Sequence, residues 1–130
     1  MNNKISTILV VEDEDLLLQA IGKKLKICGL NPVMATSGEQ ALDYLQSLEE
    51  LPDVIWLDYH LQEMNGLDFL KLVKDHKEWS KIPVVIVSNS ADEAKVHSML
   101  ALGAEKYILK AEYRLDDIIK TVKEFVPKIK

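Results

Sequence analysis

The sequence VIWLD at residues 54–58 decides the fold, because four consecutive apolar residues end directly in the carboxylate of Asp58. Such a run is too short for a helix and does not alternate, which is typical of a strand buried on both faces of a parallel sheet. The runs ILVV at residues 8–11 and VVIV at residues 84–87 have the same character. Weaker runs at residues 32–36 and 106–109 predict a second and a fifth strand.

Amphipathic helical patterns lie between and after these runs. The first is a stripe of Leu17, Ile21, Leu25 and Cys28 that stops at Gly29, a residue suited to a helix C-terminus. Cys28 is therefore expected to be a small core residue near a helix end. Capping boxes at Ser37 and Ser90 predict the starts of two further helices, and the second of these is predicted to end at Gly103. Another helix is predicted after Gly66, and the last one over residues 115–126.

The order strand–helix, repeated five times, predicts the architecture. Parallel strands need crossover connections, and these are overwhelmingly right-handed. The solution is an α/β fold: a three-layer, doubly wound (βα)5 sandwich with flavodoxin-like strand order 2-1-3-4-5. Ligands of such sheets bind beyond the carboxyl ends of the strands, here between the first and third strands.

Composition sets limits on the class of protein. A chain of 130 residues suits one domain, and a net charge of −5 argues against a nucleic-acid partner. Cys28 is the single cysteine, so an internal disulfide is excluded and a reducing compartment is indicated. No apolar run approaches the roughly 20 residues of a membrane span, and no secretory signal is apparent. We expect a cytoplasmic protein without membrane contact.

Polar residues follow four of the predicted strands, at the edge where a ligand is expected. Glu12 and Asp13 follow the first strand and Asp58 follows the third, so three carboxylates should converge. Repulsion between them calls for a cation, and an all-oxygen cluster suits Mg2+. Ser88 and Lys110 end the fourth and fifth strands, where a hydroxyl and an ammonium could bind a phosphoryl group.

The chain resembles, over essentially its whole length, the receiver domain of two-component response regulators. The resemblance rests on VVEDE at residues 10–14, WLDYHLQEMNG at residues 56–66, IPVVIVSNS at residues 82–90 and GAEKYILK at residues 103–110. It implies phosphoryl transfer to Asp58 from a histidine kinase or a histidine phosphotransfer protein. It also implies a signalling switch, not an enzyme, that catalyses only its own phosphotransfer and dephosphorylation.

The same resemblance implies the roles of the site residues. Asp13 and Asp58 would hold Mg2+ directly, Glu12 would act mainly through water, and the main-chain carbonyl of His60 would add a ligand. Ser88 and Lys110 would contact the phosphoryl group, and Ser88 and Tyr107 would carry the switch. The sequence departs from the family pattern at Gln62, Asn89 and Ala111. Ala111 stands where a proline usually follows the lysine.

The partner surface implied by the resemblance is formed by the fourth helix, fifth strand and fifth helix. No output segment follows the last predicted helix, so residues 1–130 are expected to be a single receiver domain, stand-alone or part of a longer regulator. The downstream protein is left open, as is a homodimer through this surface.

Two other functions are compatible with parts of the sequence. A small phosphatase that forms an aspartyl phosphate would want an acid two residues after Asp58, where His60 stands. A non-phosphorylated pseudo-receiver that only binds partners is disfavoured by the complete acid set, whereas Gln62 and Ala111 favour it.

Overall fold

The computed structural model describes residues 5–90 and 92–127, in which strands and helices alternate along the chain. The strands are β1 (Thr7–Val11), β2 (Asn31–Ala35), β3 (Val54–Leu57), β4 (Val84–Ser88) and β5 (Lys106–Leu109). The helices are α1 (Asp15–Ile27), α2 (Gly38–Ser47), α3 (Gly66–Asp75), α4 (Glu93–Ala101) and α5 (Leu115–Lys123). Two 3-10 turns, η1 (Trp79–Lys81) and η2 (Lys110–Glu112), complete the described elements.

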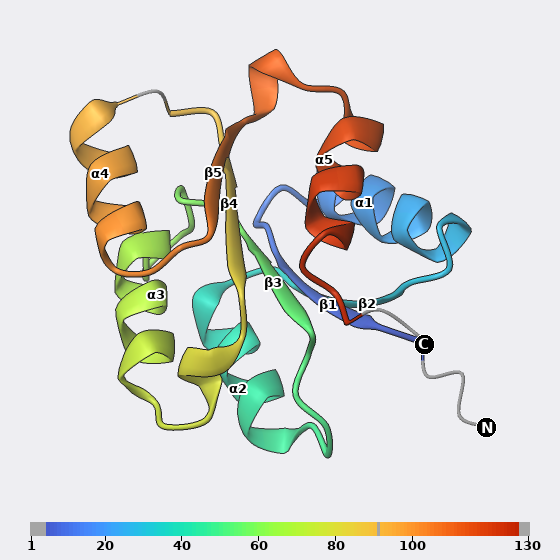
Figure 1. The fold of residues 1–130 in the computed structure, drawn as a ribbon, viewed down its shortest axis with the longest axis horizontal. Coiled ribbons are helices and arrows are strands. Elements are labelled where there is room, and N and C mark those ends of the chain that lie inside the picture. The colour runs from blue at the N-terminus through green and yellow to red at the C-terminus, as the bar shows by residue number, and fades with distance from the viewer. Residues whose placement is uncertain (1–4, 91, 128–130) are drawn as a thin grey trace.

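The sheet has five parallel strands in the order β2-β1-β3-β4-β5, which confirms the predicted topology. β1 lies between β2 and β3, with Leu9 opposite Val33 on one side and Ile55 on the other. Figure 1 shows α1 and α5 on one face of the sheet and α2, α3 and α4 on the other. The three-layer sandwich is therefore confirmed as well.

The short apolar runs become strands because the sheet is covered on both faces. Every residue of β3 and β4 is buried, so neither strand shows the alternation of a half-exposed sheet. Trp56 and Val10 face the helices α1 and α5, whereas Leu9 and Ile55 face the other three helices. Burying one large aliphatic side chain contributes ~1.5–3 kcal/mol, so two such cores can stabilise the domain without a disulfide.

Glycines end two of the helices as predicted. Gly29 follows α1 with φ of 82° and Gly103 follows α4 with φ of 112°, a backbone region that favours glycine.

The predicted start of α4 was wrong. Asp92, not Ser90, caps this helix, since its carboxylate accepts hydrogen bonds from the N–H groups of Ala94 and Lys95. Serine and aspartate are both good N-cap residues, and Asp92, two residues after Ser90, takes this position.

The prediction for Cys28 was also wrong, because its side chain is exposed. The chain turns at Gly29, and the N–H of Leu30 returns to the carbonyl of Leu25. Leu30 is thereby buried at the helix end, in the position expected for Cys28. Among residues 5–90 and 92–127, no helix has the length and apolar character needed to cross a membrane.

Candidate functional site

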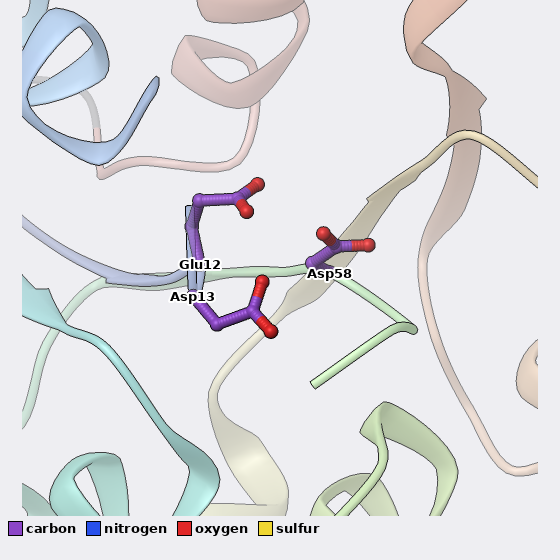
Figure 2. A group of neighbouring side chains, drawn as sticks. All are labelled: Glu12, Asp13 and Asp58. Atoms are coloured by element: carbon purple, nitrogen blue, oxygen red, sulfur yellow. The ribbon is translucent and has the colours of Figure 1, made fainter. Parts of the chain in front are cut away.

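Three carboxylates meet at the carboxyl edge of the sheet, between β1 and β3. Glu12 and Asp13 follow β1, and Asp58 follows β3, with its N–H bonded to the Val11 carbonyl at 3.0 Å. One carboxylate oxygen from each of the three residues lies within 4.8 Å of the others. Figure 2 shows the side chains of Glu12 and Asp13 directed towards Asp58. The structure thus brings together the acids that the sequence placed at the switch point of the sheet.

Glu12 is the most deeply buried of the three acids. Its side chain is held by Lys110 Nζ, 2.7 Å from Oε1, and by the Glu14 N–H, 3.0 Å from Oε2. Burial raises the pKa of Glu12, the charge of Asp58 adds to that rise, and the hydrogen bonds from Lys110 and Glu14 only partly oppose it. Burial, more than the neighbouring negative charge, therefore disfavours the ionised form of Glu12.

Asp58 is held in one orientation by a donor on each oxygen. The main-chain N–H of His60 bonds Oδ1 at 3.2 Å, and Lys110 Nζ bonds Oδ2 at 3.0 Å. Only 5% of the residue is exposed. A buried carboxylate with both oxygens fixed is preorganised to act as a nucleophile or as a metal ligand.

Lys110 links Asp58 to Glu12 as the cation of the site. Burial disfavours its charged form, but the hydrogen bond to Glu12 and the charge of Asp58 outweigh burial and raise the pKa of Lys110. Every described peptide bond is trans, including the bond from Lys110 to Ala111. Lys110 bonds both acids although Ala111 replaces the proline of the family pattern.

Ser88 and Tyr107 meet through a third residue, Ser90. The N–H of Ser90 donates to Ser88 Oγ at 3.2 Å, and its carbonyl accepts from the Tyr107 hydroxyl at 2.9 Å. Ser88 is fully buried and Tyr107 is half-buried. The two predicted switch residues are thus joined by one residue that the sequence did not single out as a bridge, because two main-chain groups, its N–H and its carbonyl, make the contacts.

In the turn after Asp58, the backbone of Gly66 lies close to the backbone of Asp58 and Tyr59, a contact that was not predicted from the sequence. The N–H of Gly66 bonds the Tyr59 carbonyl at 2.8 Å. A β-carbon at Gly66 would lie 2.6 Å from the Asp58 carbonyl oxygen and 2.8 Å from Tyr59 Cα. Glycine is therefore required where the segment 59–65 returns to the strand end, and its place in the motif at residues 56–66 was the available signal.

The donor set suits a hard divalent cation. All three candidate ligands are carboxylates, and one ammonium among them leaves an excess of negative charge. Oxygen-rich clusters of this kind favour Mg2+ over softer metals. His60 has an exposed side chain, and its main-chain N–H contacts Asp58.

The class of protein that this fold and this edge of the sheet define is the receiver domain. Residues 8–123 match the response regulator receiver domain family, and the chain belongs to that family. Such domains are phosphorylation-dependent signalling switches of two-component systems rather than ordinary enzymes. The resemblance seen in the sequence is confirmed.

Relatives of similar length support this assignment. The chain is 30% identical over 120 residues to the polar-differentiation response regulator DivK of Brucella ovis, covering 92% of this chain and 95% of the relative. It is 30% identical over 121 residues to a chemotaxis protein CheY homolog of Campylobacter jejuni, covering 88% and 92%.

Solved structures agree with the fold. A response regulator receiver protein from Pseudomonas putida superposes with a TM-score of 0.86 at 24% identity, covering 95% of this chain and 99% of that one. The phosphorylated cyanobacterial phytochrome response regulator RcpA superposes with a TM-score of 0.80 at 26% identity, covering 93% and 91%.

Proposed function

We propose that Asp58 accepts a phosphoryl group from a histidine kinase or a histidine phosphotransfer protein in a Mg2+-dependent reaction. The observation that carries the proposal is the state of Asp58: a buried carboxylate with a donor on each oxygen, beside two further acids. A carboxylate oxygen forms the bond to phosphorus while the phosphorus–nitrogen bond of phosphohistidine breaks, and the imidazole leaves with the bonding electrons.

Four groups of this chain would hold the metal: the carboxylates of Glu12, Asp13 and Asp58 and the main-chain carbonyl of His60. Bound there, Mg2+ would neutralise the charge that separates the carboxylate from the incoming phosphoryl oxygens. Lys110 lies within hydrogen-bond distance of Asp58 and would pair with the transferred group as a point charge. The hydroxyl of Ser88 would contact a second phosphoryl oxygen.

The hydrogen bonds of Ser90 would transmit phosphorylation of Asp58 to the partner surface. If the hydroxyl of Ser88 moves towards a phosphoryl group on Asp58, the N–H of Ser90 follows it, and the bond from Ser90 to Tyr107 changes. Phosphorylation would in this way shift a two-state equilibrium of the surface formed by α4, β5 and α5, where a downstream protein binds.

Residues 1–130 act as one receiver domain that catalyses its own phosphotransfer and dephosphorylation and nothing else. Its location is the cytoplasm, which suits a chain whose single cysteine excludes an internal disulfide.

The test is intact mass measurement after incubation with acetyl phosphate and Mg2+. The parent chain is expected to gain the mass of one phosphoryl group, and Asp58→Asn to gain none. Asp53→Asn is the matched control, because Asp53 lies at the opposite end of β3 and binds the Thr7 N–H. An unmodified parent chain would overturn the proposal, and release of many equivalents of phosphate would favour a phosphatase.

A further inference from the structure

The side chain next to Asp58 contacts α4, a helix that lies much further along the chain. The ammonium of Lys95, in the first turn of α4, lies over the Tyr59 ring, 4.7 Å from its centre. The imidazole of His60 meets the same ring edge-on, with the two ring centres 5.2 Å apart. A cation within ~6 Å of the centre of an aromatic ring is attracted to the face of that ring. The Tyr59–Lys95 contact therefore joins the loop after Asp58 to α4.

The main chain beside the Tyr59 ring is bonded to the acidic site. The peptide group between Tyr59 and His60 donates its N–H to Asp58 Oδ1 at 3.2 Å, and its carbonyl oxygen accepts from the Gly66 N–H at 2.8 Å. Because a peptide group is rigid and planar, a movement of this N–H also turns the main chain at Tyr59. A change at the Asp58 carboxylate can therefore reach the Tyr59 ring through a single peptide group.

The first turn of α4 has few other attachments to the rest of the fold. The structure describes every residue of Glu93–Ala101, and among them Met99, in the last turn, is the one that is buried. Within residues 5–90 and 92–127, Lys95 is the one residue of the first turn whose side chain makes a hydrogen bond, ion pair or ring contact with another element. The position of this turn should consequently depend on the Tyr59–Lys95 contact.

We propose that Lys95 is a positioning residue, which couples the loop after Asp58 to the start of α4 through the ring of Tyr59. The coupling rests on the proposed phosphorylation, because modification of Asp58 is the event that would move the His60 N–H. It is separate from the hydrogen bonds of Ser90, since none of its contacts involves that residue. α4 belongs to the proposed partner surface, so the Tyr59–Lys95 contact gives this surface a second connection to Asp58.

The first measurement tests the contact without phosphorylation. The N–H of Val96 donates to the Asp92 carbonyl at 3.0 Å, and its hydrogen exchange rate, measured by NMR, reports opening of the first turn of α4. Lys95→Met keeps a long side chain of similar helix propensity and removes the charge, so this exchange should become about two- to fivefold faster. Lys95→Arg keeps a cation over the ring and should exchange as slowly as the parent chain.

Variants of Tyr59 complete a double-mutant cycle. Tyr59→Phe keeps the ring and should preserve the exchange rate of Val96, whereas Tyr59→Leu should raise it by about the same factor as Lys95→Met. The double variant should exchange no faster than either single variant, because each substitution removes the same contact.

Lys71→Met is the matched control, because Lys71 is an exposed lysine on α3, and it should leave the exchange of Val96 unchanged. Effects of Lys95→Met and Tyr59→Leu that multiply in the double variant would overturn the role of the contact. Exchange in Lys95→Arg as fast as in Lys95→Met would overturn it as well.

The second measurement tests the coupling and uses intact mass to score phosphorylation in the same samples. With acetyl phosphate and Mg2+ in excess, modification of Asp58 should change the exchange rate of Val96 roughly twofold or more in the parent chain and in Lys95→Arg, and by less in Lys95→Met. An equal change in all three chains would overturn the coupling while the gain in mass stays intact. A parent chain that gains no phosphoryl mass would overturn the proposed function and the coupling together.

Discussion

The two sides of the carboxyl edge of the sheet are built differently. Between β1 and β3, three carboxylates and Lys110 form a charged cluster in which Lys110 bonds two acids at 2.7 and 3.0 Å. Around β4 and β5, Ser88 and Tyr107 are joined through Ser90 by neutral hydrogen bonds of 3.2 and 2.9 Å. We call the first the charged cluster and the second the Ser90 bridge.

The two regions should differ in the free energy that is lost when one of their hydrogen bonds is removed. Hydrogen bonds to charged groups contribute ~1.5–3 kcal/mol each, against ~0.5–1.5 kcal/mol for neutral ones. The free energy of unfolding should therefore change markedly when any residue of the charged cluster is replaced. The Ser90 bridge should break at little cost, as the proposed two-state switch requires.

Removal of Lys110 should have the largest effect. Lys110→Ala leaves Glu12 and Asp58 facing each other without a cation, and we expect the free energy of unfolding in EDTA to fall by about 1–3 kcal/mol. This is less than for a fully enclosed pair, because Lys110 keeps some contact with solvent. Urea unfolding measures the change, and millimolar Mg2+ should reduce it by replacing the lost positive charge.

The matched control is Lys106→Ala, which removes an exposed lysine from β5. Its unfolding curve should stay within about 0.5 kcal/mol of the parent chain. Equal losses in the two variants would mean that Lys110 stabilises the strand rather than the charged cluster.

Removal of Asp13 should act in opposite directions on stability and on metal binding. Asp13→Asn takes one negative charge from the cluster, so the metal-free chain should become more stable by about 1 kcal/mol. The affinity for Mg2+ should fall roughly tenfold or more, because a carboxylate ligand is lost. Calorimetric titration and urea unfolding measure the two effects, with the exposed Asp15→Asn as control. Unchanged Mg2+ affinity would contradict a metal role for Asp13.

The pH dependence of stability tests the burial of Glu12. Its pKa is raised in the folded chain, so its contribution to stability is present below the unfolded pKa of about 4.3 and is lost as pH rises through the folded value. Glu12→Gln keeps an acceptor for Lys110 and removes the charge. Its stability relative to the parent chain should therefore increase between pH 4 and pH 7 in EDTA. The exposed Glu14→Gln should show no such trend, and a flat difference for Glu12→Gln would contradict the raised pKa.

The fold was predictable because each strand is a short apolar run, although β2 lies one residue before its predicted range of 32–36. The bounds of β3 and β5 match the predicted ranges 54–57 and 106–109, and β1 and β4 each differ by one residue. Continuous apolar runs, separated by helical stripes, leave few ways to bury both faces of a sheet. The errors at Cys28 and Ser90 share one cause. Each lies at a helix end, where a neighbour two residues away could take the same place.

The positions of the site residues followed from the fold, but their contacts did not. Parallel strands bring Glu12, Asp13, Asp58 and Lys110 to one edge whatever their rotamers are. Which acids Lys110 would bond depends on side-chain geometry across residues far apart in the chain. The Ser90 bridge was hidden for another reason: its contacts use main-chain groups, which every residue has.

The smallest effect is expected at the Ser90 bridge. Tyr107→Phe removes the hydroxyl that donates to the Ser90 carbonyl and leaves the ring in place. Since that half-buried carbonyl can bond water instead, the free energy of unfolding should fall by only about 0.5 kcal/mol, and Mg2+ affinity should not change. Tyr44→Phe on α2 is the matched control, a half-buried tyrosine on a helix away from the bridge. A loss above about 2 kcal/mol, or weaker Mg2+ binding, would show that the bridge and the charged cluster are one rigid unit, because a neutral hydrogen bond alone cannot account for either.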